Sequence, residues 1–199
     1  MTLWRWLAGL AVVGCMVGPA WAGEIAGRAS VTDGDTLKIR DESIRLEGID
    51  APESGQHCRQ GGETWRCGQK AALALDDRID GATVRCAWSE RDRYGRIIGT
   101  CYRAETDLNA WMVHQGWALA YRRYSRAYIG EERAAERADR GIWAGEFVEP
   151  WAWRRGTRLA GGSETRDRNC GDFATQAEAQ AFFDQHQPGD PHGLDGNGD

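Results

Sequence analysis

Lysine is almost absent from this sequence of 199 residues, and the patterns that mark thiolate metal sites are missing. Only Lys38 and Lys70 are lysines, no two cysteines stand in a C-x-x-C pair, and no internal repeat is evident. The histidines show neither metal-ligand nor catalytic-triad spacing, so we assign them no role. These absences argue against a zinc site built on cysteines and against a histidine-based triad.

The positive charge is therefore nearly all arginine, and it is balanced unevenly by acidic residues. The net charge is −5; residues 24–160 are balanced, whereas residues 161–199 carry two arginines against eight acids. The planar guanidinium group suits bidentate contacts to phosphate. Codon bias in a GC-rich organism explains the overall excess equally well, so only arginines within a motif count as support for a phosphate-containing partner.

Residues 1–22 have the organisation of an export signal. Arg5 supplies a basic start, an apolar run follows through Val17, and the letters AWA before Gly23 form a small-x-small cleavage site. The apolar run is too short for a stable membrane span. We therefore expect a periplasmic or secreted protein. A lipoprotein signal ending before Cys15 is one alternative, and a buried N-terminal helix is another.

Export would leave five cysteines in an oxidising compartment, where disulfides form. Two pairings are predicted from position. Cys58–Cys67 would close a short loop, and Cys86–Cys101 would join two strand-like segments across a turn. Cys170 is then left over, and an odd thiol in an exported protein needs a partner.

Alternating apolar residues and glycine-containing turns predict strands in the first half of the exported chain. Residues 29–39 form a strand, a DGD turn and a second strand, and residues 44–49 form a third, which makes a meander. A loop covers residues 54–62 and a helix residues 63–79. Two further strands are expected over residues 83–88 and 96–102.

Two further helices complete the pattern. Asp107 can cap one that runs toward Gly116, and the other covers residues 128–140. The order of three strands, a helix, two strands and two helices predicts an α+β, mainly β fold: a five-stranded barrel of the OB type with three helices.

The barrel domain is expected to span residues 23–155. Residues 156–169 are polar and rich in glycine, which indicates a linker. Residues 170–199 form a short acidic segment. One domain of ordinary size with an appendage fits this length.

The candidate chemistry lies in the stretch IRLEGIDAPE, at the end of the third predicted strand. It contains Arg45, Asp50 and Glu53, and the meander would bring Asp35 of the first turn close to Asp50. Hard cations such as calcium bind carboxylate and carbonyl oxygens. A single aspartate in a turn usually accepts a hydrogen bond from its own backbone, so only the combination of Asp35 and Asp50 indicates a cation site.

These residues match the requirements of phosphodiester hydrolysis. A cation must neutralise the phosphoryl oxygens, a base must orient water, and donors must hold the charge of the transition state. Asp35 and Asp50 would hold the cation, and Glu53 would be the base. Arg45 and Arg96 would be the donors, although Arg45 could also be a solvated strand residue and Arg96 a simple partner of the nearby Asp92.

Four motifs together resemble the staphylococcal nuclease, or thermonuclease, family over about residues 24–150. They are DGDT (33–36), RLEGIDAPE (45–53), DRYGR (92–96) and GWALAYRRY (116–124). The resemblance implies an OB-fold barrel that acts as a monomer. It also implies calcium-dependent cleavage of DNA and RNA to 3′-phosphate and 5′-hydroxyl ends.

The resemblance also assigns roles by motif position. Asp35 and Asp50 would be calcium ligands, with Ala51 binding through its carbonyl where the best-known member has threonine. Glu53 would be the general base or water-positioning residue, and Arg45 and Arg96 would clamp the phosphate.

Further residues of the same motifs are candidates for nucleic-acid contacts. Arg93 and Tyr94 stand where the family contacts a neighbouring phosphate, with arginine in place of lysine. Tyr121 and Tyr124 would edge the cleft by packing, and base stacking is their alternative role.

The C-terminal stretch GLDGNGD resembles the start of an EF-hand-like loop, with Asp195, Asn197 and Asp199 at alternate positions. Together with residues 169–183 it resembles the Excalibur calcium-binding module. The later glycine, cysteine and glutamate of that module are missing, so we expect a truncated segment that binds calcium weakly or not at all. A disordered acidic tail is the equal alternative.

Two other function classes remain open from the sequence. One is a non-catalytic OB-fold module that binds nucleic acid or protein. The other is a calcium-binding cell-surface module with the barrel as its scaffold.

Overall fold

The computed structural model describes residues 23–159 and the single positions 175, 177, 178 and 180. The predicted export signal, Cys170 and the acidic triplet Asp195, Asn197 and Asp199 lie outside the described residues. Among the described residues, no helix is long and apolar enough to cross a membrane.

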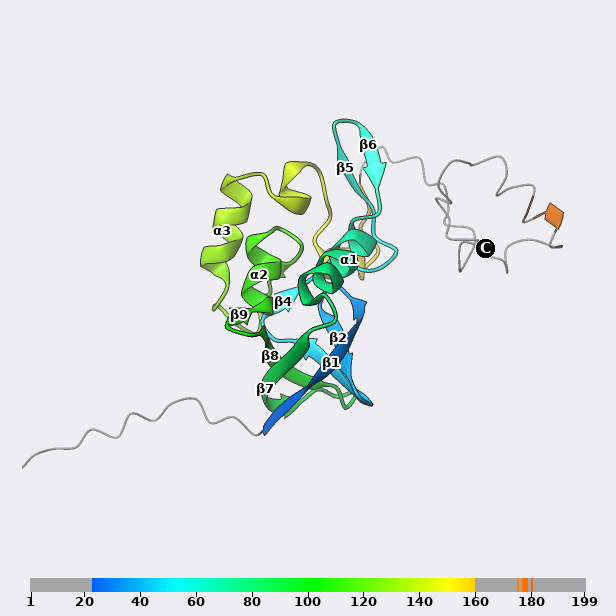
Figure 1. Ribbon diagram of the computed structural model, residues 1–199. Helices are drawn as coiled ribbons and strands as arrows, with labels where there is room; N and C mark the ends of the chain where they lie inside the picture. The colour runs from blue at the N-terminus through cyan, green and yellow to red at the C-terminus, as the bar shows by residue number, and fades with distance from the viewer. Residues whose placement is uncertain (1–22, 160–174, 176, 179, 181–199) are drawn as a thin grey trace, which may run out of the picture. The chain divides into compact units, whose positions relative to one another are not determined.

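Five strands form a closed barrel, as the sequence predicts (Figure 1). They are β1 (Gly23–Asp33), β2 (Thr36–Ile39), β3 (Glu42–Leu46), β7 (Thr83–Arg91) and β8 (Ile97–Arg103). Their order is β3-β2-β1-β7-β8, and a parallel pairing of β3 with β8 closes the ring. The remaining pairs are antiparallel.

Shorter strands extend the barrel and pair its connecting segments with one another. β4 (Ile49–Asp50) pairs with β10 (Leu119–Ala120), and β9 (Thr106–Asp107) pairs with the end of β8. β5 (Cys58–Gln60) and β6 (Glu63–Trp65) form a separate hairpin. The β4–β10 pair matters for function because it fixes the backbone of Asp50 opposite Leu119.

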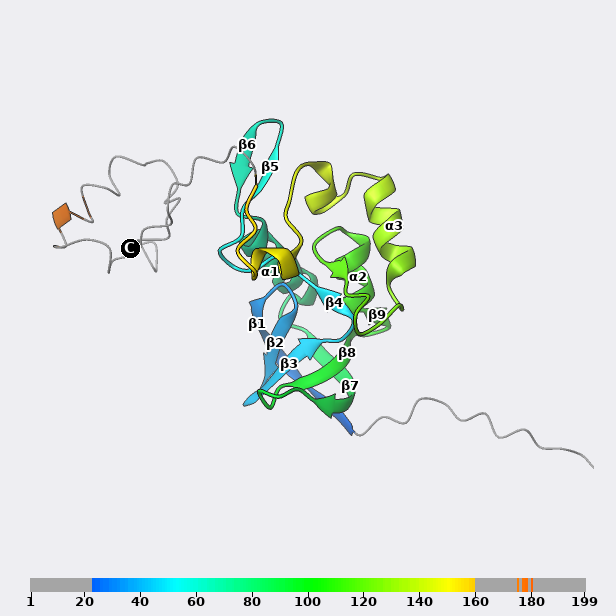
Figure 2. The same cartoon turned by 180° about the vertical axis from the view of Figure 1, so that it is seen from behind.

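The helices gather at one end of the barrel (Figures 1 and 2). They are α1 (Cys67–Ile79), α2 (Leu108–His114), α3 (Ile129–Arg137) and α4 (Pro150–Trp153), with a 3₁₀ turn η1 (Gly141–Ala144) before the last. The three predicted helices are α1, α2 and α3. The sequence does not predict η1 and α4, which are each a single turn.

The prediction is wrong at residues 58–66, where a loop and the start of a helix were expected. The β5–β6 hairpin occupies this stretch, and α1 begins only at Cys67. A disulfide between Cys58 and Cys67 ties the hairpin to the first residue of the helix. The disulfide and the hydrogen bonds between β5 and β6 hold this segment as a hairpin, although Trp65 stands at helical spacing from the residues that follow it.

The core fills the barrel and continues under the helices. Its largest fully buried side chains are Leu37, Ile39, Ile44, Leu46, Ile49, Leu75, Ile79, Ile97, Leu108, Met112, Leu119 and Ile142. The second predicted disulfide, Cys86–Cys101, is present and lies fully buried between β7 and β8. Both predicted disulfide pairings are thus confirmed.

Candidate active site

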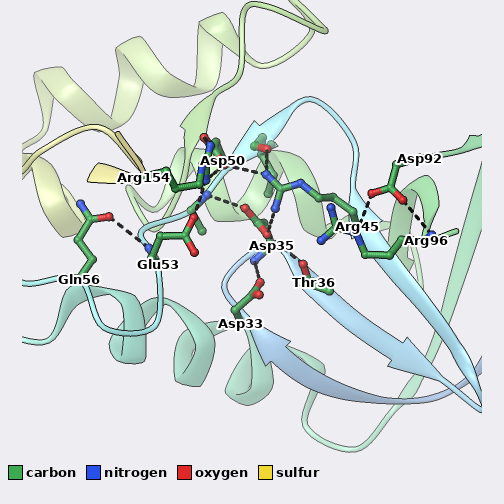
Figure 3. A network of polar contacts seen from close by, with 12 residues as sticks. Asp33, Asp35, Thr36, Arg45, Asp50, Glu53, Gln56, Asp92, Arg96 and Arg154 are labelled. Carbon is green, nitrogen blue, oxygen red and sulfur yellow. Dashed lines mark hydrogen bonds and ion pairs between the residues drawn. The ribbon is translucent and has the colours of Figure 1, made fainter. Parts of the chain in front are cut away.

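An open cleft of about 830 Å³ lies where the β1–β2 turn, the end of β3 and the segment after β4 meet. All of the residues predicted for the nuclease site except Asp50 line it, and Asp50 is buried and accepts a hydrogen bond from Arg45 (Figure 3). The lining residues from the prediction are Asp35, Arg45, Ala51, Glu53, Arg93, Tyr94, Arg96, Tyr121 and Tyr124.

Asp35 is positioned by a turn that packs tightly against its surroundings. A β-carbon on Gly34 would stand 2.7 Å from the Ala51 β-carbon and 2.9 Å from that of Ala71, so only glycine fits there. The backbone N–H of Ala51 donates to Asp35 Oδ2 at 2.9 Å, and the Thr36 hydroxyl donates to Oδ1 at 3.1 Å. These contacts hold the carboxylate at the floor of the cleft.

Arg45 lies between the two aspartates that the sequence pairs. Its Nη1 forms an ion pair with Asp35 Oδ1, and its Nη2 donates to Asp50 Oδ1 at 2.7 Å. One guanidinium group therefore bridges both carboxylates. The contacts of Arg45 thus bring both carboxylates to the same guanidinium group.

Burial raises the pKa of the Asp35 carboxyl group to about 7. The charges of Asp33 and Asp50 act in the same direction as burial, Arg45 and the Ala51 N–H oppose it, and the pKa of about 7 is the net result. A buried carboxylate near other acids is more stable when it is protonated, unless a cation neutralises it.

Glu53 stands on a rigid loop behind Pro52. Its backbone N–H donates to Gln56 Oε1 at 3.2 Å, and Gln56 is itself fully buried and donates to the Val148 carbonyl at 2.5 Å. A β-carbon on Gly68 would stand 1.7 Å from the Glu53 carbonyl oxygen, so the first turn of α1 lies directly against this backbone. The Glu53 side chain remains partly exposed toward the cleft.

Arg96 lies on the opposite side of Arg45 from Glu53 (Figure 3). Its Nε donates to Asp92 Oδ2 at 2.8 Å, so the ion pair considered from the sequence does form. Asp92 also accepts from the backbone N–H groups of Tyr94 and Arg96, which shapes the turn between β7 and β8. The pairing orients Arg96 within the cleft and does not remove it from there.

The predicted nucleic-acid residues differ in how freely they reach solvent. Tyr94 and Tyr124 are 69% and 71% exposed. Arg93 lies over the Tyr94 ring and donates to its hydroxyl at 2.6 Å. Tyr121 is stacked on Trp151 with ring centroids 5.7 Å apart, so one face of its ring is already covered.

Sequence reasoning misses one residue of this cluster, Arg154, which follows α4. Its Nη2 donates to Asp50 Oδ2 at 2.6 Å, and its Nη1 donates to Asp50 Oδ1 at 3.1 Å and to Glu53 Oε1 at 2.5 Å. Asp50 has no exposed side-chain surface and thus has two arginines as partners. No motif marks Arg154, because its partners lie about a hundred residues earlier in the chain.

Comparison with known proteins identifies the family of this chain. The profile of a family described as "Staphylococcal nuclease homologue" matches residues 43–145. The chain belongs to the staphylococcal nuclease family. The matched segment contains Arg45, Asp50, Glu53 and Arg96, and it ends before Arg154.

Several curated members of the staphylococcal nuclease family are similar over most of their length. The succinoglycan biosynthesis protein ExoI of Rhizobium meliloti is 39% identical over 136 residues, which cover 66% of this chain and 71% of the relative. The micrococcal nuclease of Shigella flexneri is 34% identical over 160 residues, covering 71% and 87%. An uncharacterized endonuclease of Haemophilus influenzae is 34% identical over 137 residues, covering 65% and 72%.

The oxygen groups of this family member fit a hard cation such as calcium. Within the described residues no three acidic, histidine or cysteine side chains form a ready-made metal cluster. Asp35 and Asp50 nevertheless both contact the Arg45 guanidinium group, and the residue directly after Asp50 is Ala51, whose carbonyl is the third predicted ligand. Two carboxylates, a carbonyl and water form the all-oxygen set that calcium accepts, and two of these groups are now held by guanidinium groups.

Proposed function

We propose that this protein is an exported calcium-dependent endonuclease that hydrolyses phosphodiester bonds of DNA and RNA. The observation that carries the proposal is the convergence of Asp35 and Asp50 on the Arg45 guanidinium group, with Glu53 and Arg96 in the same cleft. The printed names of the nuclease and endonuclease relatives support the reaction class. The two disulfides are compatible with export.

The proposed roles follow from the chemistry of each group. Asp35, Asp50 and the Ala51 carbonyl would hold calcium, which when bound neutralises charge on the phosphoryl oxygens. Glu53 accepts a proton from the water that attacks phosphorus. Arg45 and Arg96 donate hydrogen bonds to the phosphoryl oxygens as their charge grows, which is the usual work of transition-state donors.

The bond changes determine the products. The new bond joins the water oxygen to phosphorus, and the bond from phosphorus to the 5′ oxygen breaks. The leaving oxygen takes a proton from solvent and becomes a 5′-hydroxyl, while phosphate stays on the 3′ oxygen. Arg93 and Tyr94 would contact a neighbouring phosphate, and the exposed Tyr124 would edge the strand beside Tyr121.

Digestion of plasmid DNA and of a long RNA tests the proposal. Both should be cut when calcium is present and should stay intact with excess chelator. The DNA fragments should resist extension by a polymerase until a phosphatase removes their 3′-phosphate. Cutting that persists in chelator, or ends that are extended directly, would contradict the proposal, and binding without any cutting would favour the non-catalytic OB-fold module.

Glu53→Gln provides the matched variant for this assay, because it keeps the size of the side chain and removes the base. It should abolish most cutting while calcium still binds, as measured by calorimetry. Loss of calcium binding with little loss of cutting per bound calcium would make Glu53 a ligand and not the base.

A further inference from the structure

Arg154 occupies the space between two groups that the proposed reaction needs free. Its guanidinium group makes a two-point contact with Asp50, the proposed calcium ligand, and a third contact with Glu53, the proposed base (Figure 3). Asp50 Oδ1 is shared by Arg45 and Arg154, whereas Oδ2 accepts from Arg154 Nη2 at 2.6 Å. Arg154 Nη2 would therefore compete with a calcium ion for Asp50 Oδ2.

The chain presents Arg154 from an anchored turn. Pro150 begins α4, and the Arg154 N–H donates to the Pro150 carbonyl at 3.0 Å. The ring of Trp151 stacks on Tyr121, and the carbonyl of Val148 accepts from buried Gln56. Figure 2 shows α4 as the short golden helix at the end of the barrel that carries the β1–β2 turn. These contacts anchor the backbone of the turn and aim the arginine side chain at the site.

The two arginines on Asp50 differ in how readily they can leave. The Arg45 side chain is 18% exposed, whereas that of Arg154 is 39% exposed. A buried carboxylate without a counter-charge is costly, so Asp50 needs a cation in the absence of metal. Arg154 can supply that cation and can return to water when a metal arrives, since its guanidinium group already borders the open cleft.

We propose that Arg154 is a tethered counter-cation that holds Asp50 and Glu53 in the calcium-free protein and must be displaced when calcium binds. It thereby lowers the affinity of the site for calcium and makes the metal-free site stable. The inference rests on the proposed calcium site. It adds a residue outside the segment matched by the family profile, which ends at residue 145.

Calcium titration of metal-depleted protein by calorimetry tests this inference, with calcium chloride as the only ligand. Arg154→Gln removes the charge and should lower the Kd for calcium on the order of tenfold, the scale expected when one charged hydrogen-bond partner no longer competes. Arg154→Lys keeps a charge without the planar fork and should give an intermediate Kd.

Arg155→Gln is the matched control, because it removes the same charge from the next residue. Arg155 is exposed and lines a separate shallow groove with Arg122 and Trp151. Its substitution should leave the Kd within about twofold of the unchanged protein, as expected for a screened surface charge. An equal shift in the Kd from both substitutions would show that the effect comes from net charge alone, and it would overturn the inference.

Thermal melting in chelator is the second readout. Arg154→Gln should lower the Tm there, because Asp50 keeps only one counter-cation, and saturating calcium should restore the Tm. An unchanged or weaker calcium affinity in folded Arg154→Gln would overturn the inference and leave the proposed function standing. An absence of calcium binding in the unchanged protein and in every variant would overturn the proposed function as well.

Discussion

At the residue scale, the site is a cluster of carboxylates whose charge is balanced by arginines. Asp50 has no exposed surface and contacts Arg45 and Arg154, while Asp35 shares Arg45. The arrangement resembles a metal site in which guanidinium groups stand where a cation would bind. Its behaviour should therefore depend on which cation is present and on whether the acids are ionised.

Calcium binding should strengthen as the pH rises from about 5.5 to 8. Burial raises the pKa of Asp35 to about 7, and calcium requires the ionised carboxylate, so binding below that pH must displace a proton. Calorimetry in buffers of different ionisation enthalpy should detect this proton release at pH 6 and not at pH 8.5. A Kd that is constant across this range would contradict the assignment of Asp35 as a ligand.

The same raised pKa has a consequence for stability without metal. Because the folded-state pKa lies above the usual aspartate value of 3.8, the contribution of Asp35 to stability is fully present below that value and is lost as the pH rises through about 7. In chelator the Tm should therefore fall between pH 5 and 8, and calcium should reverse the fall at pH 8. Asp35→Asn, which cannot ionise, should flatten the decline.

Arg96→Ala should reduce turnover by roughly 10²–10³, the usual cost of removing one transition-state donor. The control is Asp92→Asn, which weakens the 2.8 Å ion pair and keeps the arginine. If Arg96 acts on the phosphate, the control should retain activity within about threefold, well inside the loss expected for a missing donor. Equal losses in both variants would show that the ion pair supports only the turn. Initial rates on plasmid DNA provide the measurement.

At the element scale, three separate connections each bring one part of the site into place. The β1–β2 turn carries Asp35, β4 carries Asp50 and the turn after α4 carries Arg154. The sequence predicts the turn that carries Asp35, because turn chemistry is local, but it predicts one strand over residues 44–49 where the structure has β3, a turn and β4. It does not predict the β5–β6 hairpin, where the helical spacing of Trp65 was misleading and the disulfide to Cys67 decides the local structure.

Gly34→Ala should destabilise the protein by about 1–3 kcal/mol, the typical cost of overpacking. The added carbon would stand 2.7 Å from the Ala51 β-carbon and 2.9 Å from that of Ala71. Gly55→Ala is the control, because nothing lies within 4 Å of its added carbon and its φ is not in the left-handed region. Urea unfolding should separate the two variants, and equal stabilities would show that the turn can shift without cost.

At the scale of the whole molecule, one barrel with helices at one end supports the cleft. The parallel β3–β8 pairing closes the ring, and the two disulfides cross-link the barrel wall and the hairpin that precedes α1. The side chains of Asp35, Arg45 and Asp50 are buried or mostly buried. The surrounding turns that carry Tyr94 and Tyr124 are exposed.

Replacing both Cys58 and Cys67 by serine should lower the free energy of unfolding by about 2–3 kcal/mol, as expected for a short cross-linked loop. The sequence separation of these residues is 9, against 15 for Cys86 and Cys101. Urea unfolding measures the loss. Treatment of the substituted protein with a reductant should cause a further loss from the second disulfide, and no further loss would show that this disulfide does not constrain the unfolded chain.

The sequence by itself predicted the barrel, the two disulfide pairs and five residues of the site, Asp35, Arg45, Asp50, Glu53 and Arg96, because alternation, turn chemistry and motif spacing act over short distances along the chain. Only the tertiary structure decided that Arg45 bridges both aspartates and that Arg154 reaches Asp50 across 104 residues. The Arg45 contacts depend on how the strands of the barrel meet, and the Arg154 contact depends on where the fold places α4. A buried carboxylate accepts whichever cation the fold brings to it, and no local pattern in the sequence encodes that choice.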